Sequence, residues 1–557
     1  MGMIGGILAG QSIAQAGVKC VFTLCGGHVA PIYIGLQMNG VRLIDTRHEA
    51  AAAHAADAWG RLTGIPGVAI VTAGPGVTNA VTGIANAYEA ESPMVVIGGK
   101  VGMARLDQGS LQEMDQVSLL SSITKWRACV YDTGRIPEYL ARAFHIANTG
   151  RRGTRLSRNA DRHSAQSGRS QASRSQGARS RRRPVVGRSA NGGKVRGDAR
   201  GVASSGDRGG RRAALASPGD ALDRLVRAAK IPVYLNGLGR GALPHGHPNF
   251  LSFTRKQALA KADLIILVGA EADFRLGYAR GFNKDAKVVM IESDKLKMGF
   301  NVEAQLALVG NSKFIMEQIT GALDSKKNEG PRGKWLAEMR SMEDDAVASI
   351  AEEMASDIFP VNPYRFGAEV AKVVDENTII IGDGGNIVAT TSKVVKLAGQ
   401  KQWMDPGKFG CLGVGMPFAL AAQVAYPDKR VLVVFGDGSV GFNGFEIDTA
   451  VRHNLPIVGV VGNDAAWTQI RAAQLESVGE DFAAATLLAP TRYDEFAKSL
   501  GGNGYHVESA DQIAPTIEKA FAAGKPAIVN VPLNAELNGR GCRTSPPAWL
   551  SRCRRGS

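Results

Sequence analysis

The feature that most constrains the fold of this sequence is an alternation of β-branched runs with helical stretches, which occurs near both ends of the chain. Within residues 1–150, the runs VKCVFTL, VRLIDT, VAIVTAG and MVVIGG are separated by alanine-rich stretches whose apolar residues have helical spacing. From residue 360, the runs NTIIIGDGG, RVLVVFGDG, LPIVGVVGND and PAIVNVPL alternate with helical stretches in the same way. Such alternation predicts parallel sheets covered by helices on both faces. We therefore predict an α/β fold class with two similar, doubly wound modules.

The rest of the chain divides into shorter pieces. The strand-like runs IPVYLNGLG, DLIILVGAE and KVVMIES predict a smaller α/β unit between the two modules. The stretch DSKKNEGPRGK is highly charged, which indicates a linker. The predicted order is a first module, a shortened middle domain, a linker, a second module and a basic tail, at residues 1–150, 217–322, 323–359, 360–533 and 534–557.

Residues 151–216 do not fit this pattern. Residues 151–212 contain 17 arginines, one lysine, three aspartates and no glutamate, which together account for the whole net charge of +15. The rest of the chain is electrically neutral, so its charge gives no reason to expect a nucleic acid as partner. The segment has too few apolar residues to form a core, and we predict that it is aberrant or disordered.

Two interpretations of this segment remain open. Its bias toward Arg, Ser and Gly is typical of GC-rich coding sequence read out of frame. In that case the first module would lack its closing strand and the middle domain would lack an edge. Alternatively, the segment is a genuine disordered arm whose arginines bind anions or RNA with a steep salt dependence.

Hydropathy and cysteine usage limit where the chain is expected to act. No stretch approaches the roughly 18 apolar residues that span a membrane, and the opening MGMIGGILAGQ lacks the basic start of a secretory signal. The six cysteines have no metal-type spacing, so we interpret them as reduced thiols. These features predict a cytoplasmic protein without a membrane partner.

The stretch GDGSVGFNGFEIDTAVRHNLPIVGVVGND indicates a site for a small, highly charged ligand. Its first turn follows a predicted strand, at the sheet edge where parallel α/β sheets bind ligands. Gly436 and Gly438 let a ligand approach the backbone closely, Asp437 offers oxygen to a cation, and Ser439 with the following N–H groups can hold phosphate. The next strand brings Asp464 to the same edge. A GDG turn alone can be a simple tight turn, so the second carboxylate is what favours a site.

A GDGS turn that is answered, one helix and one strand later, by Asn-Asp resembles the diphosphate and Mg²⁺ motif of thiamine-diphosphate (ThDP) enzymes. The resemblance implies that the metal ligands are the side chains of Asp437 and Asp464 and the backbone carbonyl of Ala466. Many family members have Asn where this chain has Asp464, and either residue supplies an oxygen. The resemblance extends over about 1–150 and 217–533, and it implies a pyrimidine-binding first module and a diphosphate-binding second module.

The first module carries the complementary half of the resemblance. In LIDTRHEAAAAHAADAWGRLTG, Glu49 begins a helix directly after a strand, and VTAGPGVTNAVTGIANAYEAESPMVVIGG is similar to the pyrimidine-domain core of the family. The resemblance implies that Glu49 hydrogen-bonds the aminopyrimidine ring and promotes formation of the ylid. Without the neighbouring motif, a first-turn glutamate that stabilises the helix dipole would be the simpler interpretation.

Four further positions follow from the resemblance alone. Gly385 and Asn386 correspond to family residues whose backbone contacts the cofactor. Leu412 corresponds to the bulky apolar residue beneath the bent cofactor. Trp467 lies near the diphosphate or is an ordinary core residue.

The chain is similar to several ThDP subfamilies, among them acetolactate synthases, 2-hydroxyacyl-CoA lyases and benzaldehyde lyase. His28, in CGGHVAP, resembles the lyase-like group and is expected to transfer the proton of a substrate hydroxyl. Gln112 corresponds to a substrate-facing residue of the same relatives. FAD is not expected, because Glu271 stands where the flavin-binding synthases have Arg.

Together these features predict a ThDP- and Mg²⁺-dependent carbon–carbon lyase or carboligase that acts through ylid and enamine intermediates. Its expected substrates are 2-hydroxyacyl compounds, CoA-linked among them, or 2-keto acids. The alternative within the class is acetolactate synthase, and the alternatives from other classes are an inactive homologue or a basic RNA-binding protein. By resemblance, we expect a homodimer or tetramer in which two chains share each site, with no nucleic acid and no membrane as partners.

Overall fold

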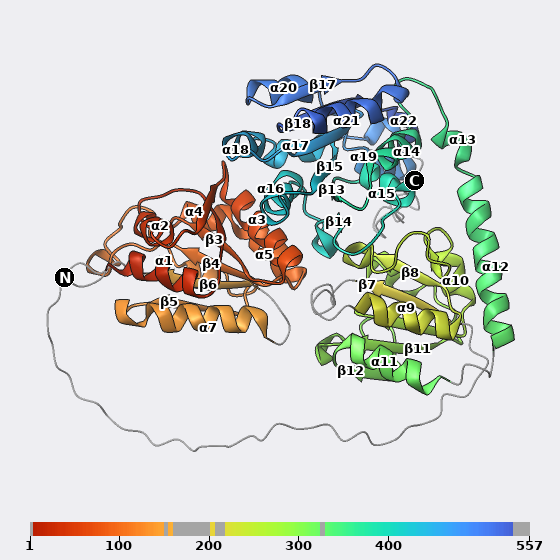
Figure 1. Cartoon of the computed structure of the whole chain (residues 1–557), viewed down its shortest axis with the longest axis horizontal. Coiled ribbons are helices and arrows are strands. Elements are labelled where there is room, and N and C mark those ends of the chain that lie inside the picture. Colours follow the sequence, from red (N-terminus) through yellow and green to blue (C-terminus); the bar gives the residue numbers. More distant parts are fainter. Residues whose placement is uncertain (1–3, 150–153, 160–200, 207–217, 324–328, 539–557) are drawn as a thin grey trace.

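The computed structural model describes the chain at residues 4–149, 154–159, 201–206, 218–323 and 329–538. These residues form three modules, each built on a six-stranded sheet in which all neighbouring strands are parallel (Figure 1). Helices cover both faces of each outer sheet, so the predicted α/β fold class with two doubly wound modules is confirmed.

The N-terminal module has a sheet in the order β2-β1-β3-β4-β6-β5. Its strands are β1 (Cys20–Thr23), β2 (Arg42–Asp45), β3 (Gly67–Val71), β4 (Met94–Gly98), β5 (Trp126–Val130) and β6 (Thr154–Asn159). Its helices are α1 (Gly5–Gln15), α2 (Ala30–Gln37), α3 (Glu49–Thr63), α4 (Pro75–Asn79), α5 (Val81–Glu89), α6 (Gln116–Leu119) and α7 (Ile136–Asn148). Phe22 and Val96 pack with α3 and α5, whereas Val21 and Val95 pack with α1, α2 and α7. Because both faces are buried, these strands are continuously apolar.

The middle domain has a sheet in the order β12-β11-β10-β7-β8-β9, a doubly wound arrangement with its first strand at the centre. Its strands are β7 (Gly201–Gly206), β8 (Val233–Asn236), β9 (Phe250–Leu251), β10 (Leu264–Val268), β11 (Lys287–Glu292) and β12 (Leu306–Val309). Its helices are α9 (Pro218–Ala229), α10 (Arg255–Lys261) and α11 (Ser312–Ala322), with the short 3₁₀ helices η3 (Gly237–Gly239) and η4 (Phe274–Ala279).

The C-terminal module has a sheet in the order β14-β13-β15-β16-β18-β17, which repeats the order of the N-terminal sheet. Its strands are β13 (Thr378–Asp383), β14 (Trp403–Met404), β15 (Arg430–Gly436), β16 (Val458–Asn463), β17 (Asn503–His506) and β18 (Ala527–Pro532). Its helices are α14 (Pro363–Val373), α15 (Asn386–Val394), α16 (Gly415–Ala425), α17 (Asp437–Asn443), α18 (Glu446–Arg452), α19 (Thr468–Val478), α20 (Tyr493–Ser499), α21 (Ile513–Ala522) and α22 (Ala535–Asn538).

Two strands lie within the segment expected to contribute no element to the sheets. Strand β6 pairs with β4 and β5, and strand β7 pairs with β10 and β8. The N-terminal sheet therefore has its closing strand, so the expectation that the first module lacks it is wrong, and the middle sheet takes its central strand from the segment that was expected to leave this domain without an edge. Ladder hydrogen bonds use backbone groups that every residue except proline carries, so a polar composition does not prevent pairing. The expectations for residues 160–200, 207–217 and 539–557 lie outside the described residues.

The residues predicted to be a linker contain helix α12 (Glu329–Ala348) and the short α13 (Ala351–Met354). Trp335 and Met339, one turn apart on α12, are 2% and 0% exposed and pack into the core of the middle domain. Glu343, a turn further on, accepts hydrogen bonds from backbone N–H groups that follow β9. Helix α12 is therefore docked on the middle domain and runs along its outer side toward the C-terminal module (Figure 1).

The two outer modules share one hydrophobic core. Helix α3 of the N-terminal module packs against α16 of the C-terminal module, and alanines of both helices join a single buried cluster. Small side chains let the two helices approach closely over their whole contact.

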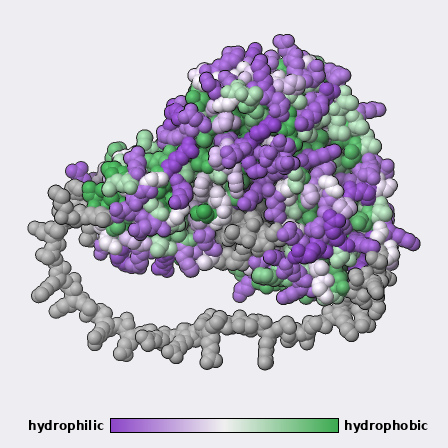
Figure 2. Space-filling view, in the orientation of Figure 1, coloured by the Kyte–Doolittle hydropathy of each residue, from purple (hydrophilic) through white to green (hydrophobic). Residues whose placement is uncertain are grey.

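Figure 2 shows hydrophilic side chains over most of one face, with smaller apolar areas on the N-terminal module. Among the described residues, no helix is both long and apolar enough to cross a membrane. The four cysteines in this part of the chain, Cys20, Cys25, Cys129 and Cys411, are free thiols.

Candidate functional site

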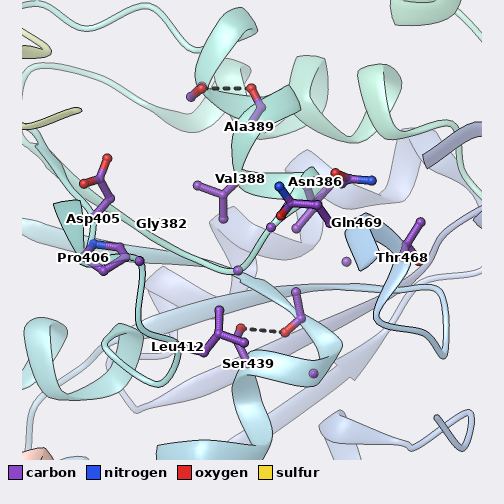
Figure 3. Close-up of a pocket in the computed structure, with 18 of the residues that line it drawn as sticks. Gly382, Asn386, Val388, Ala389, Asp405, Pro406, Leu412, Ser439, Thr468 and Gln469 are labelled. Atoms are coloured by element: carbon purple, nitrogen blue, oxygen red, sulfur yellow. Dashed lines mark hydrogen bonds between the residues drawn. The ribbon is translucent and has the colours of Figure 1, made fainter. Parts of the chain in front are cut away.

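A cavity of about 520 Å³ opens at the carboxyl edge of the C-terminal sheet (Figure 3). Its walls come from the turns that follow β13, β15 and β16, from the loop before α16, and from η3 and η4 of the middle domain. Every cofactor and metal residue predicted in the C-terminal module lines it, namely Gly385, Asn386, Leu412, Gly436, Asp437, Gly438, Ser439, Asp464, Ala466 and Trp467. The prediction that the two strand ends meet at one edge therefore agrees with the geometry.

Two carboxylates line the cavity at this edge. Asp437 follows β15 and is 3% exposed; its Oδ1 accepts the N–H of Gly438 at 2.8 Å and its Oδ2 accepts the N–H of Ala466 at 3.2 Å. Asp464 follows β16 and accepts a hydrogen bond from the hydroxyl of Thr468. Burial, and then the nearby charge of Asp464, raise the pKa of Asp437 to about 6. A divalent cation between the two carboxylates would relieve this repulsion.

The donor set fits a cation that also binds phosphate. In the part of the chain that the structure describes, no three His, Cys, Asp or Glu side chains gather into a metal site, so two carboxylates need oxygens from the ligand. A Cβ on Gly438 would lie 2.3 Å from the ring of Trp467, and one on Gly385 would lie 2.3 Å from Gln469, so packing against these side chains requires glycine at both positions. The residues present are therefore compatible with a Mg²⁺–diphosphate group.

The hydroxyl of Ser439 points into the fold rather than outward. It lies 2.6 Å from the backbone carbonyl oxygen of Asp383 and 2.8 Å from that of Gly436, and it donates to these acceptors. Its role in this geometry is to hold the turn. A phosphate at this turn would meet backbone N–H groups at the start of α17.

The predicted catalytic residues of the N-terminal module lie away from this cavity. Glu49 is the first residue of α3, is 5% exposed, and accepts a hydrogen bond from Asn79 at 3.0 Å. It does not line the cavity of its own chain, and neither do His28 and Gln112. Within one chain, the residues predicted in the two modules therefore do not line this cavity together.

His28 and Gln112 are nevertheless brought together by a residue that the sequence analysis missed. The hydroxyl of Thr72 lies 3.2 Å from Nδ1 of His28 and donates to Oε1 of Gln112 at 3.3 Å. Thr72 directly follows β3 and is 7% exposed. Its position at a strand end was the one signal that could have identified it.

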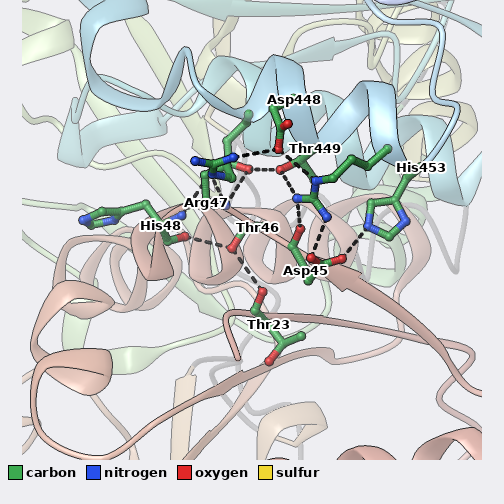
Figure 4. A network of polar contacts seen from close by, with 10 residues as sticks. Thr23, Asp45, Thr46, Arg47, His48, Asp448, Thr449 and His453 are labelled. Atoms are coloured by element: carbon green, nitrogen blue, oxygen red, sulfur yellow. Dashed lines mark hydrogen bonds and ion pairs between the residues drawn. The ribbon is translucent and has the colours of Figure 1, made fainter. Parts of the chain in front are cut away.

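A second missed group joins the start of α3 to the C-terminal module (Figure 4). Glu446, the first residue of α18, is 1% exposed and accepts the backbone N–H groups of Arg47 at 3.0 Å and His48 at 3.2 Å. Beside it, Arg452 donates to Asp45. Burial raises the pKa of Glu446 to about 7, against hydrogen bonds that favour its charged form. The two residues before Glu49 are thus held by the other module.

Comparison with known proteins agrees with this architecture. Models of thiamine pyrophosphate enzymes match in three parts: the N-terminal TPP binding domain at residues 6–119, the central domain at 209–319 and the C-terminal TPP binding domain at 364–531. Thiamine pyrophosphate is another name for ThDP. Each matched segment falls in one of the three modules, although the first ends before β5 and β6 and the central one begins after β7.

Two groups of curated relatives are similar over nearly the whole chain. A protein named acetolactate synthase large subunit IlvG, from Mycobacterium tuberculosis, is 32% identical over 550 residues, which cover 95% of each chain. Proteins named 2-hydroxyacyl-CoA lyase 2, from Bos taurus and Homo sapiens, are 33% and 32% identical, over 94% of this chain and 89% of each relative. Because matches of this length and the three domain models agree with the sheet order and the strand-end aspartates, the chain belongs to the thiamine pyrophosphate enzyme family and is a ThDP-dependent enzyme.

Proposed function

We propose that this chain is a ThDP- and Mg²⁺-dependent carbon–carbon lyase or carboligase that acts on 2-hydroxyacyl compounds, CoA-linked among them, or on 2-keto acids. The observation that carries the proposal is the pair Asp437 and Asp464, which face one cavity whose floor is built from glycines. In this proposal their side chains and the carbonyl of Ala466 hold Mg²⁺. Bound ThDP supplies a carbanion centre that adds to the carbonyl carbon of the substrate.

The remaining cavity residues are assigned to binding and shaping the cofactor. The backbone at Gly385 and Asn386 contacts it, the turn from Gly436 to Gly438 receives the diphosphate, and Leu412 supports the bent form from below. Trp467 closes the wall behind Gly438, since its ring leaves no room for a side chain there.

The site is proposed to be completed by a second copy of the chain. Glu49, His28 and Gln112 lie outside the cavity of their own chain, so a second N-terminal module has to supply them. Large apolar side chains are exposed beside both halves: Phe442 is 59% and Ile470 57% exposed by the cavity, and Leu111, beside Gln112, is 79% exposed. We propose a homodimer, or a tetramer of such dimers, with neither a nucleic acid nor a membrane as partner.

The choice between the two chemistries rests on His28. The identities to the synthase-named and lyase-named relatives are nearly equal, 32% and 33%, so they do not favour either activity. The hydroxyl of Thr72 is hydrogen-bonded to both His28 and Gln112, an arrangement suited to moving the proton of a substrate hydroxyl. This favours cleavage of a 2-hydroxyacyl donor, with acetolactate synthesis from pyruvate as the second candidate.

A flavin is not part of the proposal. Glu271 is 9% exposed and its carboxylate lies 3.6 Å from Nζ of Lys408, which leaves a buried acid where flavin-binding synthases have Arg. The reduced thiols further favour a cytoplasmic enzyme.

A paired assay tests the proposed function. The purified chain is supplied with Mg²⁺ and ThDP and given either a 2-hydroxyacyl-CoA or pyruvate, and aldehyde and acetolactate are measured. We expect aldehyde from the first substrate and little acetolactate from the second; the opposite result would establish the synthase alternative, and no product from either would contradict both. Light scattering on the same sample tests assembly, since turnover by a species of 58.7 kDa would exclude a shared site.

A further inference from the structure

Asp383, the last residue of β13, is a buried acid to which neither the sequence analysis nor the proposed function assigns a role. Its side chain is fully buried, and no ion pair within the described residues includes it. Its Oδ1 accepts the N–H of Gly413 at 3.0 Å and its Oδ2 accepts the N–H of Gly415 at 2.7 Å. Burial raises the pKa of Asp383 to about 7, against these two hydrogen bonds. Burying a carboxylate costs free energy, so an acid at this position calls for a structural or functional explanation.

The two N–H groups belong to the loop that carries Leu412 into the cavity. Gly415 begins α16, so the carboxylate also faces the positive end of a helix of 11 residues. On the opposite side, Nδ2 of Asn443 donates to the carbonyl of Gly413 at 2.6 Å. Gly413 has φ +85°, and a Cβ on it would lie 2.5 Å from Phe442, so only glycine fits. The loop is therefore held between β13 and α17.

The backbone of Asp383 reaches the other wall of the same cavity. Its carbonyl accepts the hydroxyl of Ser439 at 2.6 Å, two residues beyond Asp437. Leu412 and Ser439 both line the cavity (Figure 3). One residue thus connects the loop of Leu412, through its side chain, to the turn of Asp437, through its backbone.

We propose that Asp383 is a positioning residue that fixes the height of Leu412 above the turn that binds the diphosphate. The proposal rests on the role assigned to Leu412 in the proposed function. The two partners explain why this residue is an acid: both are N–H donors, and each takes one carboxylate oxygen. An asparagine offers a single oxygen and sets its own NH₂ group against the second donor. Asp383→Asn should therefore release one side of the loop.

The first test does not need activity. Amide hydrogen exchange is measured on the protein without ligand, in the peptide that covers residues 410–418. We expect Asp383→Asn to raise exchange there by about 10- to 100-fold, while peptides of the N-terminal sheet stay unchanged. Asp375→Asn is the matched control: Asp375 precedes the same strand and accepts the N–H of Asn377 at 3.0 Å, far from the cavity loop.

Asn443→Ala removes only the other tether of the loop and serves as a second variant if Asp383→Asn folds poorly. It should raise exchange in the same peptide to a smaller extent. Wild-type exchange in this peptide for the variants that fold would overturn the proposal.

A second test uses the holoenzyme and separates positioning from simple destabilisation. With Mg²⁺ and ThDP, Asp383→Asn should lower kcat by about 10- to 100-fold and change the Kd of ThDP by less than about threefold. Adding Leu412→Ala should then cost little more, because both changes remove the same support. Fully additive losses would contradict the proposal. If the wild-type chain binds no ThDP, the proposed function fails, whereas the exchange result still decides how the loop is held.

Discussion

The two outer modules have the same strand order, but individual buried acids in them differ in whether a cationic side chain neutralises them. In the N-terminal module, the fully buried side chain of Asp57 is neutralised within the chain: Arg61 pairs with it at 2.5 Å and Asn86 donates to it at 2.8 Å. In the C-terminal module, Asp437 and Asp383 are buried without such a partner, and the pKa of each is raised. A fold that leaves acids unneutralised loses stability unless a ligand compensates. Because other buried acids of the C-terminal module, such as Glu369, do pair with arginine, the difference marks the carboxyl edge of this sheet as the place for a cation.

The loops that follow equivalent strands of the two modules also present different chemical groups. Strand β15 ends in Gly-Asp-Gly-Ser, whereas β3, its counterpart in the repeated order, ends in Thr-Ala-Gly-Pro-Gly. The first turn presents carboxylate oxygen and the second presents Thr72, which organises His28 and Gln112. One framework thus carries two chemistries, because function lies in the strand-end loops.

The largest expected effect comes from removing the acid at the cavity. Asp437→Ala deletes the carboxylate that faces Asp464 and also the acceptor for the N–H of Ala466. We expect binding of Mg²⁺ and ThDP to be abolished, as measured by calorimetric titration of the two together. Asp511→Ala, an exposed aspartate of the same module, is the control and should bind normally. If Asp437→Ala still binds Mg²⁺ and ThDP, the acid at the carboxyl edge of the C-terminal sheet is not what binds the cation.

Glu49→Gln tests the acid of the other module and should leave the cofactor bound. Loss of a proton-transfer partner typically costs about 10²- to 10⁴-fold in rate, and we expect turnover and C2-proton exchange of bound ThDP to fall by that range. Glu138→Gln is the matched control, because Glu138 also lies in the first turn of a helix, α7, but is exposed. If the two variants behave alike, Glu49 only stabilises its helix.

His28→Ala should have a smaller effect, limited to the donor. We expect cleavage of the best 2-hydroxyacyl donor to fall by about 10- to 100-fold, with the affinity for ThDP unchanged, since the imidazole contacts Thr72 rather than the cavity. Thr72→Val should lower the same rate less, and Thr78→Val, at a hydroxyl that bonds Pro75, should not change it. Parental activity in His28→Ala would exclude this residue from the reaction.

The sequence predicted what local patterns determine. Continuous apolar runs identified the central strands, and the spacing from Asp437 to Asp464 placed two strand ends at one edge, because parallel strands end together. It could not reveal Asp383 or Glu446, because the backbone N–H groups that they accept lie 30 or more residues away and have no signature in the sequence. Strand β6 was missed because its pairing depends on neighbouring strands rather than on apolar side chains.

The smallest expected effect is on thermal stability and concerns the junction between the two outer modules. There the buried acid Glu446 accepts hydrogen bonds from the backbone N–H groups of Arg47 and His48. Its pKa is raised from 4.5 to about 7 by burial. A carboxyl whose pKa is higher in the folded state contributes stability that is fully present below pH 4.5 and is lost as the pH rises through about 7. The shift corresponds to about 3 kcal/mol across that range.

Glu446→Gln removes this dependence, since an amide does not titrate. We expect the melting temperature of the wild type, without ligand, to fall more steeply between pH 5 and pH 8 than that of the variant, by about 2–4 °C. Asp448→Asn, on the rim of the same junction, is the control: although burial opposes it, hydrogen bonds from Arg452 and Arg47 keep the pKa of Asp448 below its usual range. That acid stays ionised throughout the interval, so its variant should follow the wild-type slope. If the melting temperatures of wild type and Glu446→Gln fall equally with pH, Glu446 does not titrate as a buried acid. The effect of buried acids on stability would then be limited to those at the cavity, Asp437 and Asp383.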